Sequence, residues 1–249
     1  PPPCEGDALP TELTAHAGEV STEGLPICQQ KNGLFSKKKC ALSFPLQFFR
    51  FFCLFTTVAP RFCGEFQKGV DYRGDTDQFQ REFAVHAAIA EAFGYRVSVH
   101  SGSDKFSIFP YVGKLSGGRF HLKTSGTSWV EAVRVIAMCD PALFRRMAAF
   151  SRLHFEEARA YYHVSASLDR MPDMDNIPDK GLPALLDMVD TRQVMHITYG
   201  FLLQAKNEQG ASLFRDDIYR TLQSNKALLD SVIQDHIRRH LTLLGVTGQ

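Results

Sequence analysis

The sequence predicts an α/β fold, and two observations support that prediction. Residues 95–100 and 120–123 are short, mostly apolar runs that fit buried strands. Residues 76–93 instead place Phe79 and Phe83 four residues apart within a pattern of three- and four-residue apolar steps, which is typical of an amphipathic helix. Strands that alternate in this way with helices along a chain indicate α/β organisation.

Residues that commonly start or stop helices mark the ends of the expected elements. Asp75 or Thr76 can cap the first helix, and Gly94 supplies the left-handed residue that often ends one. Asp140 and Pro141 should end one helix and begin the next, as N-cap and first helical residue. The expected strands are 57–62, 95–100, 120–123 and 193–199, and the expected helices are 76–93, 127–138 (capped by Thr127 or Ser128), 142–162, 211–223 and 226–244.

Residues 165–192 break this regular pattern. Three prolines among many aspartates predict a long irregular segment, with at most a short helix at 182–188. Segments of this length in compact domains often serve as lids or binding loops. Three or four strands cannot close an eight-stranded barrel, so any barrel formed by this chain should be incomplete.

Composition excludes several classes of protein. The 249 residues carry a formal charge of +1, which argues against nucleic-acid binding through bulk charge. The apolar run at 41–60 contains Pro45 and Arg50, so we expect no membrane span and no signal peptide. The six cysteines lack the Cys-x-x-Cys spacing of metal or redox pairs, and we interpret them as free thiols in a reducing, cytoplasmic compartment.

Several expected strands end in polar residues, and the carboxyl ends of strands are where α/β proteins bind ligands. Glu65 and Lys68 come just after the first strand, His100 ends the second, and His121 and His196 lie in the third and fourth. Two histidines from neighbouring strands and a carboxylate from another would form an open divalent-metal site. The alternative is that these histidines are structural hydrogen-bonding residues.

Two further patterns have both a functional and a structural interpretation. The run at 124–128 precedes a helix, so it could hold a carboxylate or phosphate, or it could only cap the helix. His236 and His240 share one helix face at metal-ligand spacing. We favour a structural role for this pair, because the helix has an ordinary apolar stripe and no partner carboxylate is evident. The sequence lacks the motifs of Rossmann, P-loop, zincin and serine-hydrolase sites.

Four motifs give the chain a specific resemblance from residue 61 to about 246. They are GEFQKGVDY at 64–72, SVHSGSDKFS at 98–107, FHLKTSGTSW at 120–129 and HITYG at 196–200. With these motifs the chain resembles the tagaturonate/fructuronate epimerase family of bacterial sugar-acid enzymes. The resemblance implies the C-terminal portion of a TIM-barrel-like (β/α) fold over 58–249, which we expect to be an incomplete barrel. Residues 1–57 do not resemble the family, and we expect a disordered or non-native segment, such as translated non-coding sequence.

The resemblance also implies an activity, a cofactor and site residues. The activity is divalent-metal-dependent interconversion of D-tagaturonate and D-fructuronate, a step of hexuronate catabolism. The inverted carbon lies beyond the α-carbon, so retro-aldol cleavage and re-addition is the expected route. The implied roles are metal ligands (His100 and His121), acid/base or third ligand (Glu65), and substrate-binding residues (Lys105, Lys123, Ser125 and, less strongly, His196). The implied partner is a small keto-uronate, and a homo-oligomer is allowed.

Two alternatives stay open at this point. A metal-dependent sugar aldolase or isomerase would act on a related sugar, and whether three-carbon products accumulate distinguishes it. A catalytically silent fragment of the epimerase would lack groups that the rest of a barrel supplies. The low number of expected strands favours the fragment for the chain as given.

Overall fold

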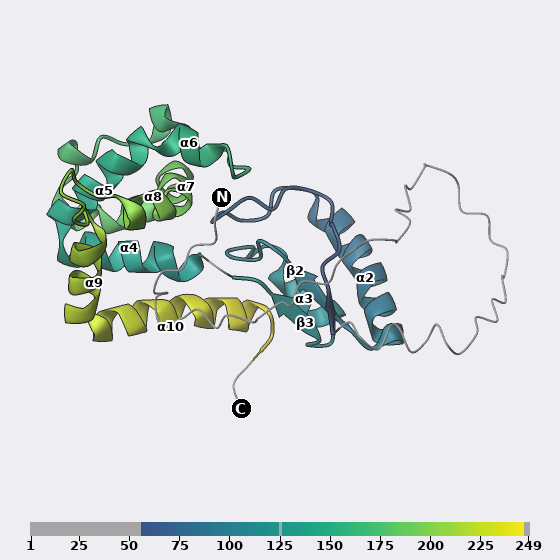
Figure 1. Ribbon diagram of the computed structural model, residues 1–249. Coiled ribbons are helices and arrows are strands. Elements are labelled where there is room, and N and C mark those ends of the chain that lie inside the picture. Colours follow the sequence, from purple (N-terminus) through teal and green to yellow (C-terminus); the bar gives the residue numbers. More distant parts are fainter. Residues whose placement is uncertain (1–55, 125, 247–249) are drawn as a thin grey trace. The chain divides into compact units, whose positions relative to one another are not determined.

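Three short parallel strands form the sheet of this protein, in the order β1 (Thr57–Val58), β2 (Arg96–Val99) and β3 (Phe120–Leu122). The structure is a computed structural model that describes residues 56–124 and 126–246, all within the unit Pro45–Gln249 (Figure 1). Val97 lies at the centre of the register, opposite Val58 on one side and Phe120 on the other. The expected α/β class is therefore confirmed, with β1 shorter than the strand predicted at 57–62.

Two helices pack beside the sheet. In α2 (Thr76–Phe93), the Asp75 side chain accepts hydrogen bonds from the first-turn amides, and Gly94 ends the helix at a φ of 75°. Both cap predictions are thus confirmed. Phe79 and Phe83 are fully buried and share one apolar cluster with Val97 and with the helix α3 (Phe109–Leu115), which the sequence reading did not anticipate.

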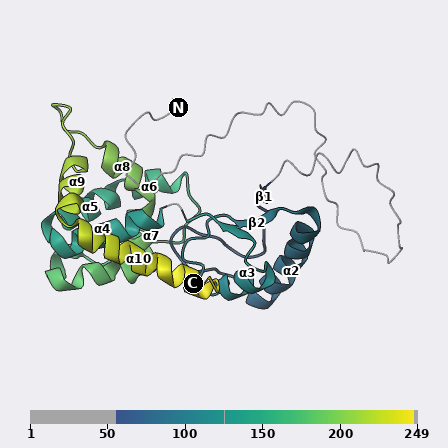
Figure 2. The ribbon, with the colours of Figure 1, turned by 90° about the horizontal axis from the view of Figure 1, so that it is seen from below.

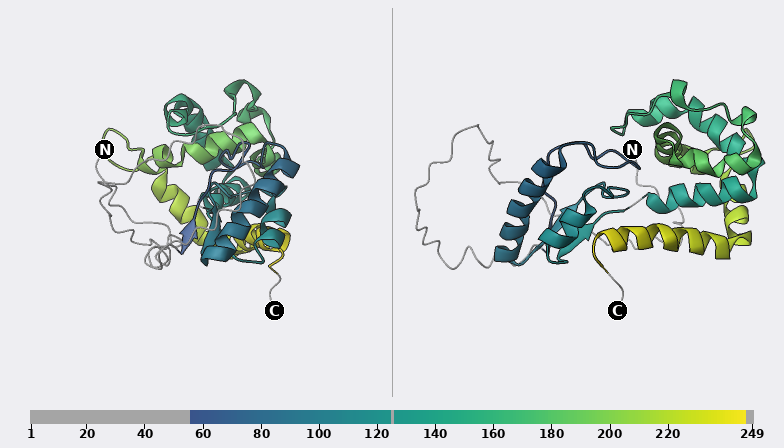
Figure 3. Two further views of the ribbon diagram at one scale, coloured as in Figure 1. Left: turned by 90° about the vertical axis from the view of Figure 1, so that its right-hand side faces the viewer. Right: turned by 180° about the vertical axis from the view of Figure 1, so that it is seen from behind.

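Seven further α-helices follow the sheet in the described part of the chain. They are α4 (Thr127–Cys139), α5 (Pro141–Leu153), α6 (Phe155–Arg159), α7 (Val189–Ile197), α8 (Tyr199–Gln204), α9 (Arg215–Ser224) and α10 (Lys226–Leu243). Helix α4 contacts α5, α7, α9 and α10, and α10 runs alongside it (Figures 2 and 3). The buried apolar side chains of these helices form a second core cluster. Asp140 caps α5 through the Leu143 amide with Pro141 at its start, as predicted.

The segment between α6 and α7 is irregular, as expected. It contains the short 3-10 helices η1 (Leu168–Arg170), η2 (Met174–Asn176), η3 (Asp179–Gly181) and η4 (Pro183–Asp187). The Asp190 carboxylate anchors the segment, because it accepts hydrogen bonds from the Ser167 amide and from the Arg170 guanidinium at 2.8 and 2.7 Å.

Two element predictions were wrong. Residues 193–199 are not a strand, because they belong to α7 and the start of α8. Eight of the nine α7 residues are buried, and a short apolar run that is buried on all sides has the same sequence pattern as a buried strand. The single helix predicted at 142–162 is instead divided at His154 into α5 and α6.

Two expectations about the whole chain have different outcomes. No helix in the described ranges combines the length and apolarity needed to cross a membrane. The prediction for residues 1–57 falls almost entirely outside the described residues and stays a prediction.

Candidate active site at the carboxyl edge of the sheet

The carboxyl ends of β2 and β3 bring several predicted site residues to one edge of the sheet. Ser98 and His121 are register partners, and their Oγ and Nδ1 atoms are 2.7 Å apart. Beyond the strands the pairing continues, because the Lys123 amide donates to the Val99 carbonyl at 3.2 Å. His100 and Lys123 therefore lie on adjacent chain segments, and both are exposed. We call His100, His121, Lys123 and Lys68 the edge cluster.

Positive charge accumulates in the edge cluster. The pKa of His100 is lowered by burial and then by the nearby charges of Lys123, His121 and Lys68. Burial also lowers the pKa of Lys68, with a further contribution from Lys123. Among the described residues, no carboxylate forms an ion pair with either lysine. The two lysines can attract an anionic ligand, and the neutral imidazole beside them can accept a proton from that ligand.

Glu65 lies on the loop before α2 rather than in the edge cluster. Its backbone pairs with Arg73 in an antiparallel bridge, and its carboxylate accepts a hydrogen bond from Gln67 at 2.7 Å. The nearest basic ring is that of His163, at 3.9 Å. Within the described ranges, Glu65 does not join His100 and His121 in a group of three potential metal ligands. The edge cluster thus offers only two imidazoles to a metal ion, which is an incomplete ligand set. The metal-ligand roles of His100 and His121 stay predictions.

Lys105 is completely buried. Its ammonium group donates to the carbonyl oxygens of Gln67 at 2.8 Å, of Ser103 at 3.0 Å and of Val70. Burial lowers the pKa of Lys105 to about 8, although Asp104 and Asp71 oppose the shift. All three donors of the group are therefore used within the protein, and the lysine fastens the 64–72 loop to the loop that follows β2. Its predicted contact with substrate stays a prediction.

His196 lies inside the protein, between two loops. It is 5% exposed, and Gly69 and Gly126 approach its ring so closely that a Cβ on Gly69 would lie 2.8 Å from Nδ1 and one on Gly126 would overlap Nε2. Burial, reinforced by Lys68 and Arg192, lowers the pKa of His196 to about 4. The ring is neutral at physiological pH, and its Nδ1 atom has no hydrogen-bond partner among the described residues.

The start of α4 differs from the prediction. Gly126, at a φ of 92°, occupies the N-cap position of α4 and makes no side-chain cap hydrogen bond. The caps predicted at Thr127 or Ser128 are therefore wrong. Ser125, predicted to bind substrate, lies outside the described residues.

A second polar cluster is buried between the loop after β2 and α10. Asp104, His236 and His240 form a group whose potential ligand atoms all lie within 4.8 Å of one another. The Asp104 Oδ2 atom also accepts a hydrogen bond from Arg192 at 2.9 Å. A structural role was predicted for the histidine pair because no carboxylate partner is evident near it in the sequence. In the structure that carboxylate is Asp104, on the loop after β2. It lies 132 residues before His236, so no local spacing in the sequence reveals the pairing.

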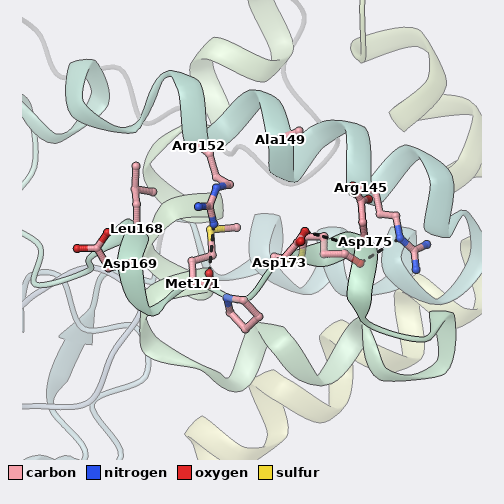
Figure 4. A pocket seen from close by; sticks show the side chains of 10 residues that line it. Arg145, Ala149, Arg152, Leu168, Asp169, Met171, Asp173 and Asp175 are labelled. Atoms are coloured by element: carbon pink, nitrogen blue, oxygen red, sulfur yellow. Dashed lines mark hydrogen bonds between the residues drawn. The ribbon is translucent and has the colours of Figure 1, made fainter.

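The surface also has hollows that do not include the edge cluster. One of 390 Å³ is lined by α5 and by the segment around η1 and η2 (Figure 4). There Arg145 and Arg152 donate to the carbonyl oxygens of Met174 and Met171, both at 3.2 Å. These arginines hold the irregular segment against α5, and no predicted site residue lines the hollow.

Comparisons with known proteins agree with the motifs. The family model of UxaE, tagaturonate epimerase, matches residues 50–244. The tagaturonate/fructuronate epimerase of Thermotoga maritima is 46% identical over 191 residues, which cover 76% of this chain and 38% of that relative.

Solved structures of the fructuronate-tagaturonate epimerase UxaE from Cohnella laeviribosi are similar as well. The crystal structures with one and with two bound glycerols match 76% and 77% of this chain, with TM-scores of 0.75 and 0.76 and identities of 54% and 53%. Each match covers 39% of the solved chain, so this chain spans about two fifths of the relatives' length. This chain belongs to the tagaturonate epimerase family, UxaE.

Proposed function

We propose that this chain carries part of an epimerase site that interconverts D-tagaturonate and D-fructuronate. The observation that supports this most directly is the edge cluster, which lies in three of the four motifs and within the family match at 50–244. The proposed fold is the corresponding part of a (β/α) barrel, in which sequential parallel strands such as β1, β2 and β3 neighbour one another.

The edge cluster has the charge and protonation that a keto-uronate requires. Lys68 and Lys123 offer positive charge to the substrate carboxylate. His100, whose pKa is lowered by burial and by these lysines, is neutral at physiological pH and can accept the β-hydroxyl proton in a retro-aldol step. The Ser98 hydroxyl, 2.7 Å from His121 Nδ1, orients that second ring. Re-addition after rotation of the aldehyde would invert the carbon without breaking its C–H bond.

A divalent metal would supply Lewis acidity to the enediolate in such a reaction. His100 and His121 are the residues that we propose to face it, because neutral imidazoles are suitable ligands. A third ligand would have to come from outside the edge cluster.

Incubation of the purified chain with D-tagaturonate and Mn²⁺, Ni²⁺ or Zn²⁺ tests the proposal, with D-fructuronate measured by chromatography. We expect turnover that His100→Ala abolishes and that His154→Ala, a histidine outside the edge cluster, retains. Reaction in deuterated water should leave the inverted carbon unlabelled. Solvent hydrogen at that carbon would contradict the retro-aldol route, and three-carbon products would indicate an aldolase instead.

A second candidate function is a folded but catalytically silent member of the family. Two observations favour it: the chain spans 38% of the Thermotoga maritima relative, and the edge cluster offers only two metal ligands among the described residues. A folded protein without turnover under every metal condition would support this candidate over the first.

A further inference from the structure

We propose that Asp104, His236 and His240 bind one divalent transition-metal ion, at a site separate from the edge cluster and independent of the proposed reaction. The Asp104 Oδ1 and His236 Nε2 atoms are 2.9 Å apart, and Asp104 Oδ1 and His240 Nε2 are 3.8 Å apart. Ligand atoms that each lie about 2.0 to 2.2 Å from a zinc-like ion are separated by distances of this order. The three side chains are 6%, 13% and 2% exposed, so they are already desolvated.

Two of these ligand atoms lack the partners that buried polar atoms normally have. Asp104 Oδ1 and His236 Nε2 face each other, yet neither makes a hydrogen bond among the described residues. Their 2.9 Å separation makes an ion pair when His236 is protonated, but a neutral His236 in the tautomer that exposes Nε2 would have two acceptor atoms in contact. An ion bound by both atoms would satisfy both.

The opposite sides of all three side chains have outer partners. His240 Nδ1 is 2.9 Å from the His236 carbonyl oxygen, and His236 Nδ1 is 3.5 Å from a Glu131 carboxylate oxygen. The second oxygen of Asp104 binds Arg192. Carbonyl and carboxylate acceptors behind ligating histidines fix the tautomer that exposes Nε2, which is the usual arrangement around metal sites.

The donor set selects the class of ion. Two imidazoles and one carboxylate suit Zn²⁺, Co²⁺ or Ni²⁺, whereas Mg²⁺ and Ca²⁺ prefer oxygen ligands throughout. The carboxylates of Asp104 and Glu131 supply negative charge, which Arg192 offsets in part. In the absence of an ion, the Asp104 amide donates to His240 Nε2 at 3.2 Å, a long contact that an ion would replace.

Such an ion would join distant parts of the chain. Asp104 lies on the loop after β2, and the histidines lie on α10, which also packs along α4. Closing a loop of this length by a metal stabilises the folded state, since the unfolded chain has no preformed site. The site therefore predicts metal-dependent stability rather than metal-dependent turnover alone.

A Co²⁺ titration of the EDTA-treated protein tests the proposal through visible d–d absorption, with a parallel Zn²⁺ melting series. We expect a cobalt spectrum that Zn²⁺ displaces, and a melting temperature about 5 °C higher in saturating Zn²⁺. His236→Gln should lose the melting shift and the absorption of the buried site, whereas Arg238→Ala on the exposed face of α10 and His100→Ala at the edge should keep both.

These variants separate the two proposals. Binding that survives His100→Ala but not His236→Gln locates the ion at the buried site even when no turnover occurs. If the wild-type protein shows neither spectrum nor melting shift, the cluster is only a set of polar contacts within the protein, and the metal proposal is overturned. The wild-type titration needs no variant. A wild-type protein without spectrum or melting shift therefore overturns the proposal even if the His236→Gln chain fails to fold.

Discussion

Substitution of Gly126 by alanine should destabilise the protein through one identifiable clash. Gly126 has a φ of 92°, which costs an L-residue about 1 to 2 kcal/mol. Its new Cβ would also overlap Nε2 of His196. That ring cannot retreat, because it is buried and Gly69 closes its other side. Overpacking of a buried site typically costs about 1 to 3 kcal/mol, so we expect a total loss of about 3 kcal/mol.

Gly118 provides a control for the backbone part of this cost. Its φ is 80°, and a Cβ there would meet nothing within 4 Å, so Gly118→Ala should cost only about 1 kcal/mol. Urea denaturation of both variants gives the two free energies of unfolding, and the double variant Gly126→Ala with His196→Ala gives the coupling. We expect His196→Ala to remove about 2 kcal/mol of the Gly126→Ala penalty. Equal losses for the two glycine variants, or no coupling to His196, would refute the reasoning.

Three further predictions concern buried polar groups. Lys105→Met should lower the free energy of unfolding by about 3 kcal/mol in urea, because three buried carbonyl oxygens lose their donor. Wild-type stability should also rise relative to that variant between pH 8 and 10.5, where the folded chain releases the Lys105 proton before the unfolded chain does. For His196, the folded pKa of about 4 lies below the ordinary 6.5. Its contribution should therefore be complete above pH 6.5 and fall by about 3 kcal/mol toward pH 4, as a difference from His196→Gln. An NMR titration in which the His196 ring takes up a proton near pH 6.5 would contradict this. Trp129→Phe should cost about 1 to 3 kcal/mol by thermal unfolding, because the Trp129 indole donates to the Met195 carbonyl at 2.8 Å; a neutral substitution would show that the bond contributes little.

Local signals in the sequence predicted the elements around the sheet well. The Asp75 cap, the Gly94 stop and the Asp140–Pro141 junction act within one or two helical turns, and the structure has all three. Helix α7 could not be identified in the same way. Its Arg192 and Gln193 are buried because they hydrogen-bond to the carbonyl oxygens of Gly69 and Lys68, more than 120 residues away. Burial of this kind removes the polar face by which a helix is recognised.

The same reasoning explains what the sequence revealed of the site. His100, His121 and Lys123 were identified because the carboxyl ends of parallel strands meet at one edge, a rule that needs only strand positions. Asp104 and His236 belong together through packing of α10 against α4 and the loop after β2. Their separation along the chain carries no periodic signal, so only the folded structure brings the acid to the histidines.

The residues of the motifs divide into two physical classes, and this division affects how the chain should be tested. Lys105, Gln67 and Gly69 are buried. Lys105 donates a hydrogen bond to the Gln67 carbonyl, and α7 donates hydrogen bonds to the Gln67 side chain and the Gly69 carbonyl. His100 and Lys123, from the same kind of motif, are exposed at the edge. The buried residues can hold the loops in place without any other chain, because the hydrogen-bond partners named above belong to this chain. The exposed residues need a ligand, or protein groups beyond the edge cluster, to act. Intact loop architecture in a chain that covers two fifths of its relatives is therefore expected whether or not the chain turns over substrate, and only assays that read binding or chemistry at His100 and Lys123 distinguish an active chain from a silent one.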